Sequence, residues 1–287
     1  MGIQLITFGG LHVKSGDREL AQVRSQHSRA ALLLYLVCER RVSRDTLMAL
    51  FWSESEFGNA GHALRQGLYH LRKVLDCDCF LSLEHEIIVR DDIAADATAM
   101  TGAMESGDIE RAFRLYRGAF LDGIHLMDVG PWESWVDRRR ARYARLFRKA
   151  CRELLDHKAV ARDHAGAIDV ADRWISLEPT DDEAQHRLIA ALAAAGERAE
   201  AIRQYETYAR LLVPEGLEPL DETRTLVERL RRQRDNPLLL RPATTAQAAV
   251  TLVKSRKRLR RSHRRQFNAF TRAATHWPSA RPLRLPD

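Results

Sequence analysis

The chain has 287 residues, of which 45% are hydrophobic and 30% are charged, and its formal net charge is +7. This apolar content excludes a wholly disordered protein, and the lack of any run of about 18 apolar residues excludes a membrane-spanning helix. Because the length suits two domains and the N-terminus has no secretory signal pattern, we expect a soluble two-domain protein of the cytoplasm that has no membrane partner.

The N-terminal residues predict a small sheet followed by two helices. Residues 3–8 alternate apolar and polar side chains, and two glycines then turn the chain into residues 11–14, so these segments predict an antiparallel pair. The Ala- and Leu-rich run 28–37 is too long for a strand and predicts a buried helix. Ser43 is the expected N-cap of the next helix.

A third helix and a hairpin complete the first predicted domain, residues 1–93. Asn59 is the expected N-cap of this helix, which carries apolar residues at spacings of four, three and four: Leu64, Leu68, Leu71 and Leu75. Residues 80–83 and 87–89 predict the hairpin, whose tip is acidic and therefore disfavours phosphate contact. A sheet, three helices and a hairpin in this order predict a winged helix-turn-helix.

From residue 96 to residue 234 the pattern is helical and predicts a second domain. Residues 167–177 match residues 201–211 at an offset of 34, which is the tetratricopeptide period. Thr180 is the expected N-cap of an Ala-rich helix that ends at Gly196, because Glu183 has the capping-box spacing. The predicted fold class is mainly α: an N-terminal winged helix with small β elements, followed by an α-helical tetratricopeptide-like repeat domain.

The last segment, residues 235–287, predicts a basic, disordered tail. Residues 251–287 hold eleven basic residues and one acidic residue, whereas the first 250 residues hold 35 basic and 38 acidic residues. The tail has eight candidate cations for sequence-independent phosphate binding: Lys254, Arg256, Lys257, Arg258, Arg260, Arg261, Arg264 and Arg265. The alternatives are a solvated tail without a partner and a tail that binds RNA.

Four long motifs resemble one known family. They are residues 42–52 and 64–75 in the first domain, and residues 116–123 and 178–196 in the second. In this order they resemble the bacterial transcriptional activator domain family, whose members include the antibiotic regulatory proteins. The resemblance covers roughly residues 3–233 and implies a DNA-binding transcription regulator with an α-helical module behind the winged helix.

The third helix supplies the candidate DNA-reading face. Arg65 and Gln66 lie opposite its leucines and are the predicted base-reading residues, because Arg pairs bidentately with guanine and Gln with adenine. The predicted phosphate contacts come from this helix and from the first turn of the preceding one: Ser43, Arg44, His62, Tyr69 and Lys73. The alternative is a solvated face on a structural helix, and His70 and Arg72 are open to either role.

The remaining motifs predict neither catalysis nor a bound metal or cofactor. Five aromatic residues are expected to pack between helices rather than to form a ligand cage: Trp132, Trp135, Tyr143, Phe147 and Trp174. The histidines lack a neighbouring nucleophile or metal-ligand spacing, and no phosphate-binding glycine loop occurs. Cys77 and Cys79 have no second ligand pair, and four cysteines are too few for a disulfide framework.

Two functions from different classes remain. The leading one is a sequence-specific transcriptional regulator, an activator in preference to a repressor, whose residues 1–93 bind double-stranded DNA. Its residues 96–234 would form a homodimer or contact another protein such as RNA polymerase. The alternative is a protein-interaction scaffold that is built on the helical repeats and does not bind DNA.

Overall fold

The computed structural model describes residues 2–52, 57–90, 92–125 and 130–235. The chain from Met1 to Arg231 forms one compact unit, and the boundary predicted near residue 95 falls inside it. None of the described helices is long and apolar enough to cross a membrane. The eight candidate cations of the tail lie outside the described residues.

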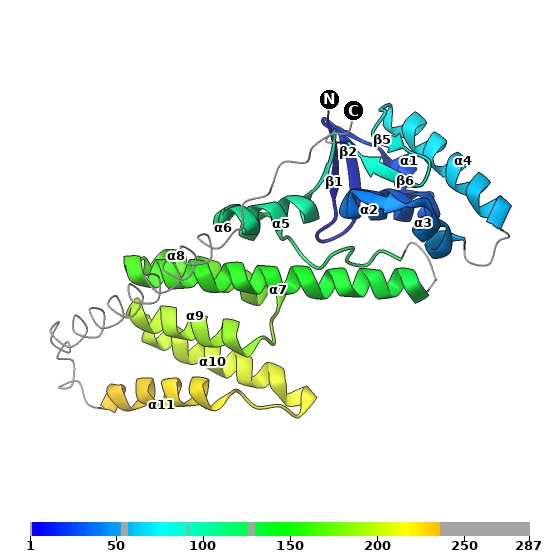
Figure 1. Ribbon diagram of the computed structural model, residues 1–287. Helices are drawn as coiled ribbons and strands as arrows, with labels where there is room; N and C mark the ends of the chain where they lie inside the picture. The colour runs from blue at the N-terminus through cyan, green and yellow to red at the C-terminus, as the bar shows by residue number, and fades with distance from the viewer. Residues whose placement is uncertain (1, 53–56, 91, 126–129, 236–287) are drawn as a thin grey trace, which may run out of the picture. The chain divides into compact units, whose positions relative to one another are not determined.

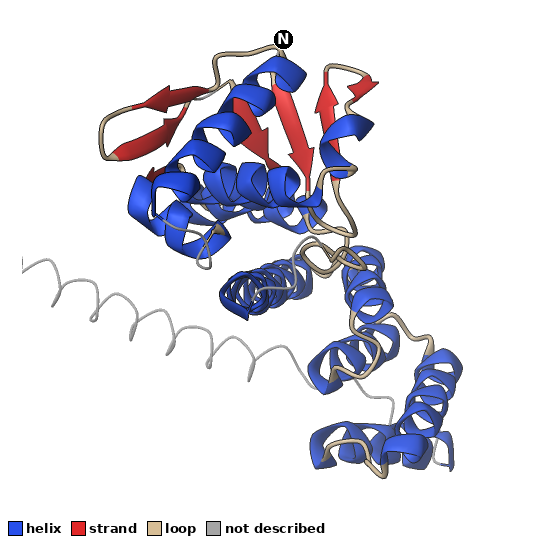
Figure 2. Ribbon diagram, turned by 90° about the vertical axis from the view of Figure 1, so that its right-hand side faces the viewer, coloured by secondary structure: helices blue, strands red, loops and turns tan. Residues whose placement is uncertain are grey.

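Two small sheets occupy the N-terminal part of the chain, as Figure 2 shows. The first has the strand order β3-β2-β1-β7 and consists of β1 (Ile3–Ile6), β2 (His12–Ser15), β3 (Arg18–Glu19) and β7 (Ile93–Ala95). Strand β1 pairs antiparallel with β2, as predicted, and parallel with β7. The second has the order β4-β6-β5 and consists of β4 (Arg41–Ser43), β5 (Phe80–Ser82) and β6 (Glu86–Val89). It contains the predicted hairpin with β4 added.

Four helices belong to this part: α1 (Ala21–Arg24), α2 (His27–Glu39), α3 (Arg44–Phe51) and α4 (Phe57–Leu75). The predicted N-cap of α3 is confirmed, since the Ser43 hydroxyl oxygen accepts a 3.0 Å hydrogen bond from the Thr46 amide. The predicted N-cap of α4 is wrong. Helix α4 begins at Phe57, so Asn59 already has helical residues before it and lies in the first turn.

After β7, all the secondary structure of the described residues is helical (Figure 1). The helices are α5 (Asp96–Ser106), α6 (Ile109–Leu115), α7 (Gly130–Ala161), α8 (His164–Leu177), α9 (Asp182–Ala194), α10 (Arg198–Leu212), a 3-10 turn (Val213–Glu215) and α11 (Asp221–Asp235). Helix α7 packs on α8, α8 on α9, and α9 on α10. The large residues at matching positions of the predicted repeat, Trp174 and Tyr208, are both buried.

The predicted N-cap of α9 is wrong by one residue. The side chain of Asp181, rather than that of Thr180, accepts the capping hydrogen bond from the Ala184 amide. With Asp181 as the cap, Glu183 is the second helical residue and not the third, so it cannot complete a capping box, and its carboxylate binds the Arg152 guanidinium of α7. The end of α9 agrees with the prediction, since Gly196 stops it in a left-handed conformation with φ +87°.

A junction of aromatic rings joins the sheets and α2 to the later helices. Phe8 contacts the rings of Tyr116, Phe120 and Tyr143. The predicted packing role of the five aromatic residues is confirmed, because all five are buried: Trp132, Trp135, Tyr143, Phe147 and Trp174. The core is therefore continuous from the first sheet to the repeats.

Polar groups tie the same junction together. The Glu39 carboxylate of α2 accepts hydrogen bonds of 2.6 Å from Trp135 Nε1 and 2.5 Å from Arg139 Nη2, both on α7. At the start of α5, the Asp96 carboxylate accepts from the backbone amide and the hydroxyl of Thr7. Burial raises the pKa of Asp96, and its hydrogen bonds to Thr7 oppose that rise.

Candidate nucleic-acid interface

Helix α4 is held in place by its apolar face. The four predicted leucines of this face are each at most 2% exposed: Leu64, Leu68, Leu71 and Leu75. Gly67 is also buried, and a Cβ atom there would lie 3.1 Å from Leu32 Cδ2 of α2. This glycine lets α4 approach α2 closely, a role that the leucine pattern alone did not reveal.

The opposite face of α4 is exposed. The structure brings five of the predicted site residues together on it, and each of them is exposed: His62, Arg65, Gln66, Tyr69 and Lys73. The Tyr69 side chain is unusually open for an aromatic residue, at 62% exposure, and its ring contacts only the edge of the neighbouring His70 ring among the described aromatic residues. An exposed face rich in long polar side chains has the shape and chemistry that a major groove admits.

The electrostatics of this face favour an anionic partner. Helix α4 contains Arg65, Arg72 and Lys73 and no acidic residue between Phe57 and Leu75. Arg65 and Lys73 form no ion pair with any residue in the part of the chain that the structure describes. Their charges are thus left uncompensated on the exposed surface.

Arg72, whose role the sequence left open, turns towards the hairpin. Its Nη2 atom donates hydrogen bonds to the Phe80 carbonyl at 2.6 Å and to the Ser82 hydroxyl at 3.1 Å. Its Nε atom lies 3.3 Å from the Asp78 carboxylate. Arg72 therefore braces α4 against the hairpin rather than facing the solvent with Arg65.

The two remaining predicted phosphate contacts lie at the start of α3 and already have intramolecular partners. The Ser43 hydroxyl is occupied by the α3 cap. Arg44 donates its backbone amide to the His85 carbonyl and its Nε atom to the Leu83 carbonyl. Only the Nη groups of Arg44 remain without a hydrogen-bond partner among the described residues. These two residues anchor the hairpin to α3, and the structure does not bring them onto the face of α4.

The hairpin between β5 and β6 carries negative charge at its tip. Glu84 and His85 are exposed there, and the Glu86 carboxylate lies 3.5 Å from Arg41 Nε. Leu81 and Leu83 each expose 40% of their surface. An acidic and partly apolar tip disfavours phosphate, in contrast to the exposed surface of α4, which has no acidic residue. At the base of the hairpin, the side chains of Cys77 and Cys79 lie next to each other, with Cα atoms 5.3 Å apart.

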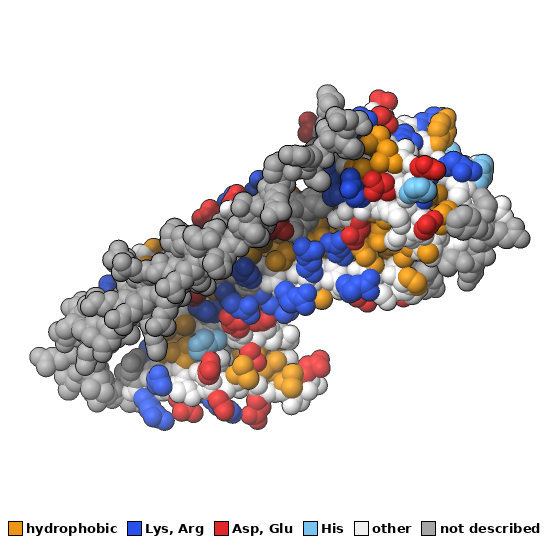
Figure 3. Space-filling view, viewed as in Figure 1, with side chains coloured by type: hydrophobic (Ala, Val, Ile, Leu, Met, Phe, Trp, Pro, Cys, Tyr) orange, Lys and Arg blue, Asp and Glu red, His pale blue; other side chains and the backbone are white. Residues whose placement is uncertain are grey.

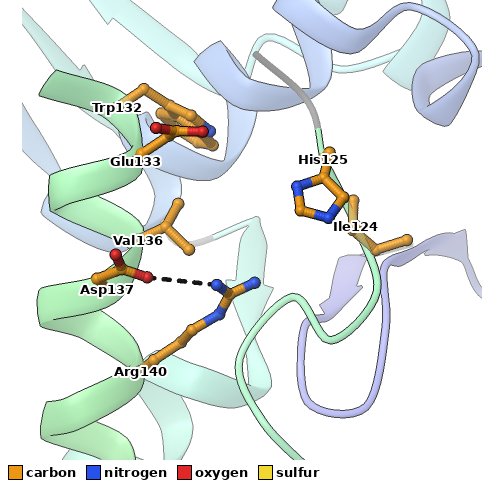
Figure 4. A pocket seen from close by; sticks show the side chains of 7 residues that line it. All are labelled: Ile124, His125, Trp132, Glu133, Val136, Asp137 and Arg140. Carbon is orange, nitrogen blue, oxygen red and sulfur yellow. Dashed lines mark hydrogen bonds and ion pairs between the residues drawn. The ribbon is translucent and has the colours of Figure 1, made fainter. Parts of the chain in front are cut away.

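A hollow of about 220 Å³ beside α7 was not predicted from the sequence. It is lined by Ile124, His125, Trp132, Glu133, Val136, Asp137 and Arg140 (Figure 4). The Arg140 guanidinium in this hollow already has partners, since it donates hydrogen bonds to the Phe120 and Leu121 carbonyls and to the Asp137 carboxylate. Arg140 thus holds the loop before α7 and offers little to a bound anion.

Comparisons with known proteins identify relatives of the chain. The model of the bacterial transcriptional activator domain family matches residues 76–231. The regulatory protein AfsR of Streptomyces griseus is 27% identical over 239 residues, which cover 78% of this chain and 24% of the relative. AfsR of Streptomyces coelicolor is 27% identical over 256 residues, which cover 83% of this chain and 25% of the relative. The chain spans about a quarter of the length of these relatives.

One solved structure has a similar fold. It is Mycobacterium tuberculosis EmbR in complex with a low affinity phosphopeptide, with a TM-score of 0.53 and 20% sequence identity. The match covers 88% of this chain and 69% of that one. Together with the observed elements, this likeness confirms the predicted fold class of a winged helix followed by helices.

Proposed function

Because the chain belongs to the bacterial transcriptional activator domain family of regulators, we propose that it is a sequence-specific DNA-binding transcriptional activator. The observation that carries the proposal is the exposed face of α4, which has two uncompensated cations and no acidic residue on a winged helix. In this arrangement the cationic helix enters the major groove.

The exposed residues of α4 divide by chemistry into two groups. Arg65 and Gln66 read base edges, since a guanidinium matches guanine O6 and N7, and a carboxamide matches adenine N6 and N7. His62, Tyr69 and Lys73 bind phosphate and fix the register of the helix on the duplex. Arg44 adds a phosphate contact through its Nη groups, and Ser43 supports it as the cap of α3.

The helical part has a different task in this proposal. Residues 1–93 bind DNA, and residues 96–234 form a homodimer or contact a second protein such as RNA polymerase, because stacked helix pairs offer extended surfaces for such partners. The basic segment 235–287 adds sequence-independent attraction for nucleic acid. The chain works in the cytoplasm without catalysis, a metal or a cofactor.

Selection of binding sites from random duplex DNA with the full chain tests this function. Enrichment of one motif is the expected result. A chain that enriches no motif, and whose DNA binding disappears when residues 236–287 are removed, would be the protein-interaction scaffold instead. The acidic hairpin tip is the observation that keeps the scaffold as the second candidate.

A further inference from the structure

Helix α7 carries nine lysine and arginine residues, and most of them are neutralised. Six form an ion pair with an acidic side chain: Arg139, Arg140, Arg148, Lys149, Arg152 and Lys158. The other three are exposed and make no ion pair or hydrogen bond within the described residues: Arg138, Arg142 and Arg145. We call these three arginines the α7 row.

The α7 row is aligned along one face of the helix. Its members are four and three residues apart, the spacing that places side chains above one another, and they span about 10 Å at 1.5 Å per residue. Figure 3 shows Lys and Arg side chains gathered along the band of surface over α7. Like charges at this spacing repel one another, so a bound polyanion would stabilise the row.

We propose that the α7 row binds the phosphate backbone of the duplex that α4 reads, outside the base pairs that α4 contacts. This inference rests on the function proposed above. Phosphates recur every 3.4 Å of helix axis along one DNA strand, so a short row of cations meets several of them. The guanidinium group suits phosphate because its forked donors bind two oxygens at once.

Two observations favour DNA over an acidic protein segment as the occupant. The first 250 residues carry a net charge of −3 and the hairpin tip is acidic, so the folded part of the chain has no overall positive charge to attract DNA, and unpaired cations near α4 would supply that attraction locally. The row also begins beside that part, since Arg139 follows Arg138 directly and binds Glu39 of α2. A duplex is stiff over about 150 base pairs, so DNA that extends beyond α4 stays nearly straight over the short length of the α7 row.

The test compares the full-length wild type with the triple variant R138Q/R142Q/R145Q. Two duplexes carrying the selected motif are needed, one that ends at the motif and one that is extended by about one helical turn, roughly 10 base pairs, on each side. On the long duplex, wild-type affinity should fall about 40-fold more than that of the variant between 50 and 200 mM salt, because three phosphate contacts contribute about 0.9 each to the salt slope. On the short duplex the two proteins should bind alike. The preference for the motif over a scrambled sequence should not change.

The matched control is the triple variant R203Q/R210Q/R229Q, which removes three exposed arginines from α10 and α11. It changes the net charge equally and should keep the wild-type salt slope. If the wild type enriches no motif, the proposed function fails and this inference fails with it. If the wild type selects a motif but the α7-row variant keeps the wild-type slope on the long duplex, only this inference is wrong. A variant that binds DNA normally but no longer activates transcription would point to an acidic protein on the row, and would equally overturn the inference.

Discussion

Replacing Glu39 by alanine tests the junction between α2 and α7. The carboxylate accepts from Trp135 Nε1 and Arg139 Nη2, and the Arg139 side chain is only 14% exposed. Glu39→Ala therefore leaves a largely buried guanidinium without its acidic partner, for which a cost of about 3–5 kcal/mol is typical of buried pairs. Because the Glu39 side chain is itself 30% exposed, water will compensate part of this cost, and we expect about 2–3 kcal/mol.

The assay is urea-induced unfolding followed by tryptophan fluorescence, with thermal unfolding as a second measurement. For a folded unit of this size, 2–3 kcal/mol corresponds to a fall of roughly 4–12 °C in Tm. Glu39→Gln is the matched control, because its amide oxygen still accepts from Trp135 while the charge is lost, so its effect should be smaller. A Glu39→Ala protein within about 0.5 kcal/mol of wild type, the usual range for surface substitutions, would refute a stabilising junction.

Three further predictions concern α4 and the buried thiol of Cys38. Gly67→Val should lower the free energy of unfolding by about 1–3 kcal/mol, because the new side chain presses on Leu32. Urea-induced unfolding measures this loss, and an unchanged midpoint would contradict the close approach of α4 to α2. Arg65→Ala should lose about 1–3 kcal/mol at one base position of the selected motif, whereas Lys73→Ala should weaken all sequences alike, as competition binding with single-base variants would show. If the two variants lose affinity with the same sequence profile, the division between base-reading and phosphate-binding residues is wrong. Burial raises the pKa of the Cys38 thiol to about 12, so at pH 8 iodoacetamide should modify this thiol only in denaturant. Mass spectrometry would detect the modification, and modification of Cys38 in the folded protein would disprove its burial.

The sequence predicted those parts of the fold that repeat within one element. Leucines at spacings of four, three and four identify the buried face of α4 and hence its exposed face. Ser43 was predicted as a cap because its partner, the Thr46 amide, is only three residues away. Local periodicity and local hydrogen bonds can be inferred from neighbouring residues alone.

Features that depend on distant residues were missed or misplaced. Strands β4 and β7 have three residues each, too few for a readable alternation, and each forms by pairing with a distant strand. Asp181 rather than Thr180 caps α9, although both residue types are good caps, and Glu183 contacts Arg152 of α7. Such competition is decided by tertiary contacts.

The candidate site shows the same division. The sequence placed His62, Arg65 and Gln66 on an exposed face from periodicity alone. It did not place Arg72, which faces the hairpin only because the chain turns back after α4. The aligned arginines of α7 were also overlooked, since they stand out only once the ion pairs of their neighbours are known.

Helix α7 has a mechanical consequence because of its length. It runs without interruption from Gly130 to Ala161, about 48 Å at 1.5 Å per residue. Its first half holds Glu39 through Trp135 and Arg139, and its second half holds α9 through Arg152 and Glu183. One continuous helix therefore contacts both α2 and α9. A partner that moves the repeats together with α7 would therefore also displace α2 and the helix α4 that packs on it.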